Sequence, residues 1–538
     1  MKLKIAVSQF NSQAGNLQEN SKKILEDIKK ARQQKADLIV FPELALSGQC
    51  QLSPSFASEN KSLIEEIAKQ TQNIAAIIGF VDNDKNAAAV IQNGKISVVH
   101  KIILKQDEPF KAAETTHPVS LTIQNQTIKV GILIGQDIVD QTTTKKPSRI
   151  LRQQGAELLV AIGSFSYSKE SLELRKLSAH YHADTNGIPM LFVNSVGLEQ
   201  HGHHIVVLDG RSFFADKQGN LLELLSFCQE GLFFINTDTE KISKPLQVES
   251  QLNEKYIATI FGLQQYAKQS CFEKAVVALS GGIDSAVTLA IASEALGKQN
   301  VVALHMPSQH TKSSSKDAAQ QLAKNLGVKL ILDPITETTD CFVASYQRSH
   351  SQMKNPVVLQ NLNARLRALK LLSYSNDNNV LIIGTANKTD IVLNNTTLFG
   401  DSTIGVLPLG DISKKEIYEF ASMINKKKKI IPEQIIKAKP DSELGEKSED
   451  QFNYDIVSPL VDLLLANESK ASLMQRFKEK KLPCSNSIYN LKPQQFSKLI
   501  DELSERMHQY AYKHLQLPPM LTFTQRKRHF NLFDSWRD

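Results

Sequence analysis

A glycine-containing loop between a predicted strand and a predicted helix is the part of this sequence best suited to chemistry. It reads Ser-Gly-Gly-Ile-Asp-Ser at 280–285 and directly follows the apolar run 275–279. Apolar residues then recur at helical spacing at Val287, Ala290 and Ile291. Two glycines remove the Cβ atoms that would keep a phosphate off the backbone, and a helix start offers free N–H groups and a positive dipole end. The pattern predicts a phosphate-binding loop, although the lysine of a Walker A motif is missing.

Two later segments place further polar residues after predicted strands. An apolar run at 301–304 continues into His-Met-Pro-Ser at 305–308, and another at 380–383 continues into Gly-Thr-Ala-Asn-Lys at 384–388. Open α/β sheets bind their ligands at the carboxyl ends of the strands. These segments therefore fall where a site that adenylates a substrate needs them.

The elements that must position these residues divide the chain into two parts. With 538 residues, the chain is long enough for two or more domains. The first half alternates helix-like stretches with short apolar runs, which predict strands at 4–9, 38–41, 75–80, 130–134, 158–162 and 190–193. Segments 206–209 and 212–215, separated by a glycine, have the pattern of antiparallel strands. We place the domain boundary near 240–255, which gives domains 1–245 and 250–538.

Composition limits the classes of protein to which the chain can belong. The net charge of +7 suits anionic nucleotide substrates and is too mild and dispersed for nucleic-acid binding. The five cysteines are scattered, which predicts neither a disulfide framework nor a zinc site. There is no long apolar run and no signal-peptide pattern, so we expect a cytoplasmic protein without a membrane anchor. The basic run 426–429 reads as a solvated helix end, with phosphate contact as the alternative.

The order of the motifs in the second half resembles the NAD synthetase family. The loop at 280–285 is similar to the pyrophosphate loop of ATP pyrophosphatases, and Met-Pro-Ser at 306–308 matches the next family motif. The resemblance implies a doubly wound, Rossmann-like parallel sheet. It also implies that ATP activates the nicotinate carboxylate of deamido-NAD, after which ammonia displaces AMP.

The resemblance assigns site residues one by one. Those expected to bind ATP are Ser280, Gly281, Gly282, Asp284, Ser285 and Thr385. Those expected to contact deamido-NAD are Asn361, Arg365, Lys414 and Lys513. Asp284 and Asp390 are the candidates for ordering Mg²⁺.

Several positions depart from the family pattern on the side of the acid substrate. The Glu and Gln of an E-N-x-Q motif become Gln360 and Asn363, a Gly-Tyr pair becomes Asn-Asn at 394–395, and a Q-x-D-E segment becomes Lys-Ser-Glu-Asp at 447–450. These changes leave two alternatives open. One is a nucleotide-binding pseudoenzyme or regulatory scaffold, and the other is a ligase acting on a related acid such as nicotinate mononucleotide.

The first half resembles the nitrilase-type glutaminase domain that is fused to NAD synthetase in glutamine-dependent enzymes. That family has a four-layer αββα fold and a Glu-Lys-Cys triad. The segment Phe-Pro-Glu-Leu at 41–44 places Glu43 as the general base, Lys101 stands where the oxyanion-stabilising lysine belongs, and Glu108 matches a supporting glutamate. The resemblance also implies a homo-oligomer.

The third member of the triad is missing. The family strand ends in G-x-x-I-C-E-D, whereas residues 131–137 read Gly-Ile-Leu-Ile-Gly-Gln-Asp, so Gly135 occupies the position of the nucleophile. Loss of the nucleophile in a well-characterised hydrolase costs on the order of 10⁶-fold in kcat. We therefore expect no glutaminase activity and the use of free ammonia. Cys50 is an alternative nucleophile, but it follows a different strand.

Overall fold

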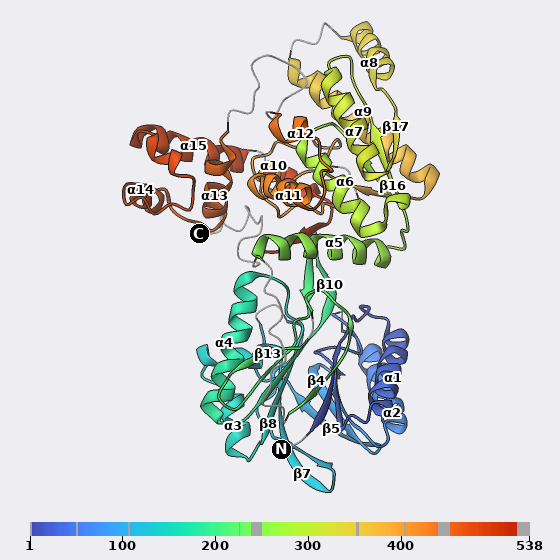
Figure 1. Cartoon of the computed structure of the whole chain (residues 1–538), viewed down its shortest axis with the longest axis vertical. Coiled ribbons are helices and arrows are strands. Elements are labelled where there is room, and N and C mark those ends of the chain that lie inside the picture. Colours follow the sequence, from blue (N-terminus) through green and yellow to red (C-terminus); the bar gives the residue numbers. More distant parts are fainter. Residues whose placement is uncertain are drawn as a thin grey trace. The chain divides into compact units, whose positions relative to one another are not determined.

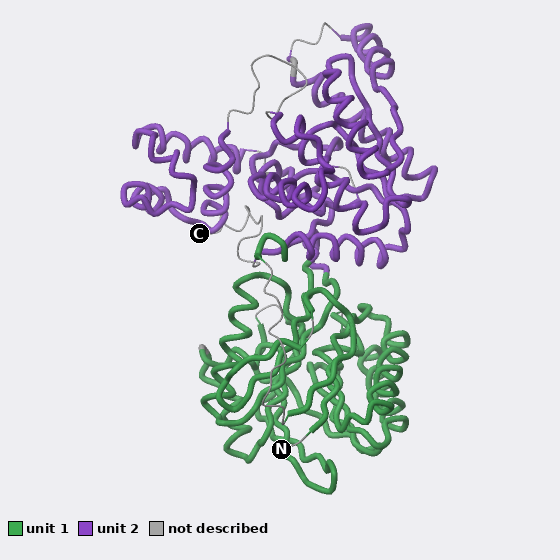
Figure 2. The backbone as a smooth tube through the Cα atoms, viewed as in Figure 1, with its two compact units in different colours: residues 1–199, 206–254 green, residues 200–205, 255–538 purple. Residues whose placement is uncertain are grey.

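The computed structural model describes residues 3–49, 52–105, 108–224, 226–237, 250–350, 355–402, 405–438, 452–509 and 511–524. The chain divides into two compact units (Figure 2). The first contains residues 1–199 and 206–254, and the second contains residues 200–205 and 255–538. Within the described residues, no helix is long and apolar enough to cross a membrane. Cys50 and the segment 447–450 lie outside the described residues.

The first unit is built on two six-stranded sheets. The strands of one sheet, in spatial order, are β14 (Gly231–Asn236), β1 (Lys4–Gln9), β2 (Leu38–Val40), β3 (Ala75–Asp82), β4 (Lys85–Gln92) and β5 (Lys95–His100). Those of the other are β13 (Leu221–Glu223), β12 (Phe213–Ala215), β9 (Met190–Asn194), β8 (Leu158–Gly163), β7 (Gln126–Ile134) and β6 (Val119–Ile123).

Alternation along the strands gives each sheet two apolar faces. On β1, Ile5 and Val7 point into the core shared by the two sheets, whereas Ala6 packs with the helices on the other face. These helices are α1 (Leu17–Gln33) and α2 (Pro54–Gln70) on the first sheet, and α3 (Pro147–Gln153) and α4 (Lys169–Asn186) on the second (Figure 1). The predicted four-layer αββα sandwich is confirmed.

The two segments around Gly210 are both strands, but they belong to different sheets. Residues 206–209 fall in β11 (His204–Asp209), which follows β10 (Val196–His201) outside the two six-stranded sheets, whereas 213–215 form β12. At the turn, Gly210 has φ +67° and lies against the side chain of Gln9. This turn redirects the chain from one sheet to the next.

The second unit contains a parallel four-stranded sheet. Its spatial order is β17 (Lys329–Leu332), β16 (Val301–His305), β15 (Ala275–Ala278) and β18 (Leu381–Ile383). The chain runs outward from β15 to β17 and then returns to β18 on the other side of β15. The strand order therefore reverses between β15 and β18, at the edge where such sheets bind ligands.

Helices connect the parallel strands of this sheet and pack on it. Those that connect its strands are α6 (Ile283–Leu296), α7 (Ser313–Leu326), α8 (Thr336–Ser349) and α9 (Pro356–Asn378). Leu362 and Leu366 of α9 pack with Val276 and Ile382 of the sheet, whereas α6 and α7 pack on β16 and on each other. The predicted doubly wound sheet is confirmed. The second unit also contains α5 (Gln251–Gln269, from Lys255 on), α10 (Lys388–Val392), α11 (Lys414–Lys427), α13 (Tyr454–Leu465), α15 (Pro493–Gln509), a 3-10 turn at Ala511–Gln516 and β19 (Met520–Thr522).

Candidate functional site

The loop between β15 and α6 is held by its own serines. The Ser285 hydroxyl donates to the Gly282 carbonyl at 3.0 Å and accepts from the Ser280 N–H at 3.3 Å. The Ser280 hydroxyl accepts from the Gly282 N–H at 3.1 Å. No side chain among the described residues caps α6 at Gly282. The loop therefore presents an uncapped helix N-terminus at the carboxyl end of β15, which is an arrangement suited to an anion.

The two glycines of the loop differ in what they require. Gly281 has φ +91°, and a Cβ atom there would lie 2.6 Å from the backbone oxygen of Ser315, at the start of α7. Gly282 has an ordinary φ of −88°, and its nearest neighbour would be the Ser280 hydroxyl at 3.3 Å. Only Gly281 is thus demanded by the fold itself.

Asp284 and Asp390 are brought together by one amide group. The side-chain NH₂ of Asn387 donates to Asp284 Oδ1 at 3.0 Å and also to the Asp390 carboxylate. The Asn387 side-chain oxygen accepts from the Asp390 N–H and so caps α10. Thr385, half-buried, lies just before this cap, in the segment that follows β18.

Lys414 faces the same two carboxylates. Its Nζ lies 2.6 Å from Asp284 Oδ2. Burial lowers the pKa of Lys414, but Asp284 and Asp390 outweigh burial and raise that pKa above its usual value. Two carboxylates fit Mg²⁺, which is usually held by one or two carboxylates and the phosphates of its substrate. Within the described residues, no group of three or more His, Cys, Asp or Glu side chains is arranged as a metal cage.

A buried ion pair lies behind the segment that carries Thr385 and Asn387. Lys388 Nζ is 2.7 Å from Asp411 Oδ1 and 3.2 Å from Asp462 Oδ1. Burial raises the pKa of Asp411, but the Lys388 ammonium outweighs it and lowers that pKa to about 2. Asp411 also accepts from the Phe523 N–H, directly after β19. This ion pair connects the start of α10 to the C-terminal part of the chain.

Three of the residues expected to contact deamido-NAD hold a single loop, residues 394–401. Asn361 accepts from the Thr397 hydroxyl at 3.0 Å, and Arg365 Nε donates to the Leu398 carbonyl at 3.1 Å. Lys513 Nζ donates to the carbonyls of residues 394 and 396 at 3.1 and 2.8 Å. Burial lowers the pKa of Lys513. The structure thus gathers these three residues around one loop, while Lys414 lies at the aspartates.

Two of the departures from the family pattern have local structural roles. Asn363 is 2% exposed and accepts from the Thr339 hydroxyl at 3.1 Å. Asn394 adopts φ +59°, a conformation that asparagine tolerates better than most residues, and its amide donates to the Arg506 carbonyl. Both asparagines therefore make contacts that belong to the fold.

In the first unit, Glu43 and Lys101 form a buried pair. Lys101 Nζ lies 2.8 Å from Glu43 Oε1 and 2.8 Å from Glu108 Oε2, and the Lys101 side chain is 3% exposed. Burial lowers the pKa of Lys101, but the two glutamates outweigh it and raise that pKa; burial also raises the pKa of Glu108. Glu43 further accepts from the Asn86 amide at 2.8 Å and the Ser164 N–H at 3.0 Å.

Gly135 directly follows β7 and faces this pair. It has φ +51°, and a Cβ atom on it would lie 2.6 Å from both Glu43 Oε2 and Lys101 Nζ. Real Cβ atoms do not come this close to other atoms. The glutamate and the lysine therefore fill the space into which a side chain at this position would begin.

Sequence reasoning gave no role to several residues that position these groups. Asn387 joins Asp284 to Asp390, and Asn86 and Ser164 complete the shell of Glu43. Asp137, which is 1% exposed, accepts from the N–H groups of residues 102, 103 and 134. The available signal was position, because Asn387 and Ser164 each follow a buried strand and Asp137 lies two residues after Gly135.

Known protein families match both parts of the chain, as the resemblances noted in the sequence predict. The carbon-nitrogen hydrolase family matches residues 4–244, and the NAD synthase family matches residues 256–498. The glutamine-dependent NAD(+) synthetase of Thermotoga maritima is 29% identical over 520 residues, which covers 86% of this chain and 89% of that protein. The protein of the same name from Synechocystis sp. is 29% identical over 503 residues, covering 86% and 88%.

Solved structures show the same fold. The glutamine-dependent NAD+ synthetase of Acinetobacter baumannii, in complex with ADP, superposes with a TM-score of 0.75 at 23% identity, covering 99% of this chain and 97% of that one. The enzyme of the same name from Cytophaga hutchinsonii gives a TM-score of 0.81 at 17% identity with the same coverage. The chain belongs to the glutamine-dependent NAD(+) synthetase family, in which a carbon-nitrogen hydrolase domain precedes an NAD synthase domain.

Proposed function

We propose that this chain makes NAD from deamido-NAD, ATP and free ammonia. The proposed ligase reaction is supported by the uncapped loop at 280–285. This loop lies beside the Asp284–Lys414 pair, at the edge of the sheet where the strand order reverses. The proposed use of free ammonia is supported by Gly135, which stands at the position of the nucleophile and lies against the Glu43–Lys101 ion pair.

The reaction needs charge stabilisation more than protein nucleophiles. The nicotinate carboxylate oxygen bonds to the α-phosphorus of ATP, and pyrophosphate leaves. Ammonia nitrogen then bonds to the acyl carbon, loses a proton, and AMP leaves with the former carboxylate oxygen. Negative charge builds up on the phosphates in the first step, so the N–H groups of the loop and the Lys414 ammonium are placed to stabilise it.

Mg²⁺ fits this proposal as the partner of the triphosphate. Asp284 and Asp390 are the residues of the chain that would hold it, and the ion would neutralise the phosphate oxygens and orient the leaving group. Asn387 donates to both carboxylates through one amide group, which holds them near each other.

The acid substrate has a candidate platform in loop 394–401. Asn361 and Arg365 hold this loop from α9, and Lys513 holds it from the C-terminal part of the chain. We assign these residues the task of shaping the dinucleotide side of the site. The asparagines at 363 and 394, which make fold contacts, are compatible with this assignment.

One experiment tests both the proposed ligase reaction and the proposed use of free ammonia. Purified full-length protein is incubated with deamido-NAD, ATP and MgCl₂, with ammonium chloride in one reaction and glutamine in another, and NAD, AMP and pyrophosphate are followed by chromatography. We expect stoichiometric NAD, AMP and pyrophosphate with ammonium, and no NAD above background with glutamine.

Each half has its own contrary result. NAD formation from glutamine would refute the ammonia proposal when stray ammonia is consumed by 2-oxoglutarate, NADPH as the reductant and an NADPH-dependent glutamate dehydrogenase, which yields NADP and not NAD. ATP binding without pyrophosphate release under any ammonium concentration would refute the ligase proposal and favour a nucleotide-binding scaffold.

A further inference from the structure

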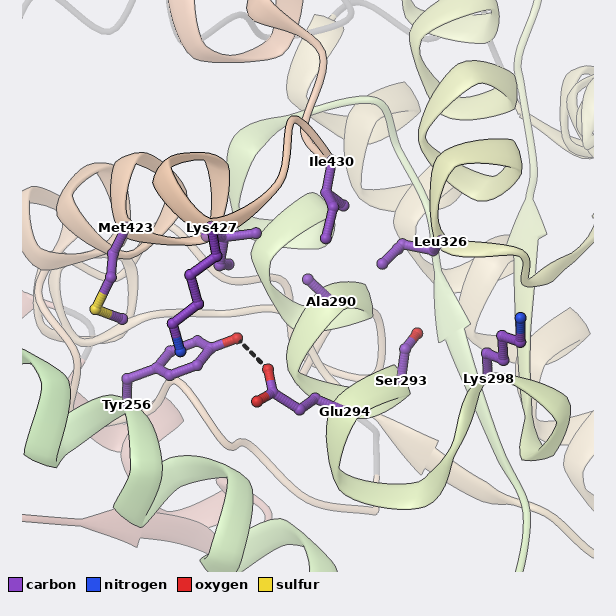
Figure 3. A pocket seen from close by; sticks show the side chains of 10 residues that line it. Tyr256, Ala290, Ser293, Glu294, Lys298, Leu326, Met423, Lys427 and Ile430 are labelled. Atoms are coloured by element: carbon purple, nitrogen blue, oxygen red, sulfur yellow. Dashed lines mark hydrogen bonds between the residues drawn. The ribbon is translucent and has the colours of Figure 1, made fainter.

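A cavity of about 280 Å³ lies in the second unit, at the far ends of the two helices that carry Asp284 and Lys414. It is bounded by α5, α6, the end of α7 and the end of α11 (Figure 3). Asp284 lies in the first turn of α6, whereas Ala290 of the cavity comes six residues later, about 9 Å along the helix axis. The cavity is therefore separate from the phosphate loop.

The floor of the cavity is apolar. Ala290 of α6 and Ile424 of α11 are each 5% exposed, and Leu326 and Ile430 also line the cavity. The volume is near the lower end of the range for small-molecule pockets, roughly 300–1,000 Å³. A ligand of this site would be small and would place an apolar body against these side chains.

The charged groups at the rim are mainly positive. Lys298 and Lys427 both line the cavity, and the Lys427 ammonium lies 6.0 Å from the centroid of the Tyr256 ring. The one lining carboxylate, that of Glu294, accepts a hydrogen bond from the Tyr256 hydroxyl at 2.7 Å (Figure 3). Lys427 belongs to the exposed lysine run 426–429, for which the synthetase reaction supplies no role. The charge balance at this rim favours an anion.

We propose that this cavity binds a small organic anion with an apolar body, such as an alkyl monocarboxylate, and that occupation changes the affinity of the synthetase site for ATP. The second part rests on the proposed function. Its physical basis is that α6 and α11 pack on each other and each carries one member of the Asp284–Lys414 pair. A ligand in the cavity would contact both helices and would therefore change the position of one helix relative to the other.

Binding is tested directly by calorimetry with octanoate on the full-length protein, with octylammonium as the ligand of opposite charge. We expect octanoate to bind and octylammonium to bind more weakly. Lys427→Glu should weaken octanoate by about three- to tenfold, because exposed charge pairs contribute modestly. Lys426→Glu, a neighbouring lysine that does not line the cavity, is the matched control and should change the affinity less than twofold.

A second variant fills the cavity. Ser293, on α6, is half-buried and lines the cavity, so Ser293→Phe should abolish octanoate binding. Equal octanoate affinity in Lys427→Glu and Lys426→Glu, or no binding to the unmodified protein, would overturn the proposed site. These measurements need no turnover and therefore stand even if NAD formation fails.

The coupling is read from the dissociation constant of ATP, measured with and without saturating octanoate. We expect a change of twofold or more in the unmodified protein and none in Ser293→Phe. An unchanged dissociation constant, with octanoate bound, would overturn the coupling.

Discussion

A Cβ atom on Gly135 would lie 2.6 Å from the Nζ atom of Lys101, the residue that pairs with both Glu43 and Glu108. The backbone at Gly135 also has φ +51°, in the left-handed region that costs other residues energy. The ion pair can therefore occupy this space only because residue 135 has no Cβ atom. A side chain at 135 would require the buried ion pair to rearrange.

The first prediction concerns this closed arrangement. Gly135→Ala should lower the free energy of unfolding by more than the roughly 1–2 kcal/mol expected from left-handed backbone alone, because the methyl group must also displace Glu43 and Lys101. Gly187→Ala is the matched control, since Gly187 has φ +62° and nothing within 4 Å of its Cβ position. Chemical denaturation measures both, and equal losses would show that the pair yields without cost.

The second prediction separates the two glycines of the phosphate loop. Gly281→Ala should raise the dissociation constant of ATP by about tenfold or more, because its Cβ would meet the Ser315 backbone and the loop must change shape. The same variant should lower the thermal midpoint. Gly282→Ala has an ordinary φ and should leave the free energy of unfolding within about 0.5 kcal/mol. Calorimetric titration with ATP and thermal unfolding provide the measurements, and equal behaviour of the two variants would contradict the assignment.

The strands of the first unit could be predicted closely because buried strands appear as short, continuous apolar runs. The prediction at 4–9 coincides with β1, and that at 158–162 lies within β8. The partners of the strands at 206–209 and 212–215 could not be predicted. The strand β12 pairs with β9 and β13, which are contacts set by tertiary packing and not by the local pattern.

In the candidate sites, too, some residues could be predicted from local motifs, whereas the roles of others depend on tertiary contacts. Glu43 and Lys101 stand in motifs with local signatures, and the structure places their charged groups 2.8 Å apart. Asn387 stood in a segment that the sequence singled out, but neither Asn387 nor Asn86 had a predicted role, because an amide that holds a carboxylate looks like any other asparagine in sequence. Their roles emerge only when elements distant in the chain are brought together.

The third prediction concerns pH. The pKa of Asp411 is lowered to about 2 in the folded chain, against about 3.9 when unfolded. Its contribution, about 2–3 kcal/mol, is therefore fully present above about pH 5 and is lost as the pH falls through about 2. Asp411→Asn should be less stable than the unmodified protein at pH 7, and the difference should shrink between about pH 5 and pH 2. Urea denaturation across this range measures it, and a difference independent of pH would mean that the Lys388–Asp411 pair contributes nothing.

The last prediction concerns Lys414 and Asp284. Lys414→Met should reduce kcat for pyrophosphate release by about 100-fold, because a positive group facing the phosphates is lost. Lys414→Met should lower the stability less than Asp284→Asn does. Lys414→Met leaves the Asp284 carboxylate unpaired, but that side chain is 22% exposed and can be solvated. Asp284→Asn leaves the Lys414 ammonium unpaired, and that side chain is only 6% exposed. Lys415→Met, one residue along α11, is the matched control and should retain kcat within about threefold. Pyrophosphate release and thermal unfolding, measured together on the three variants, test the assignment. Equal kcat in Lys414→Met and Lys415→Met would show that the buried ammonium serves the fold and not the reaction.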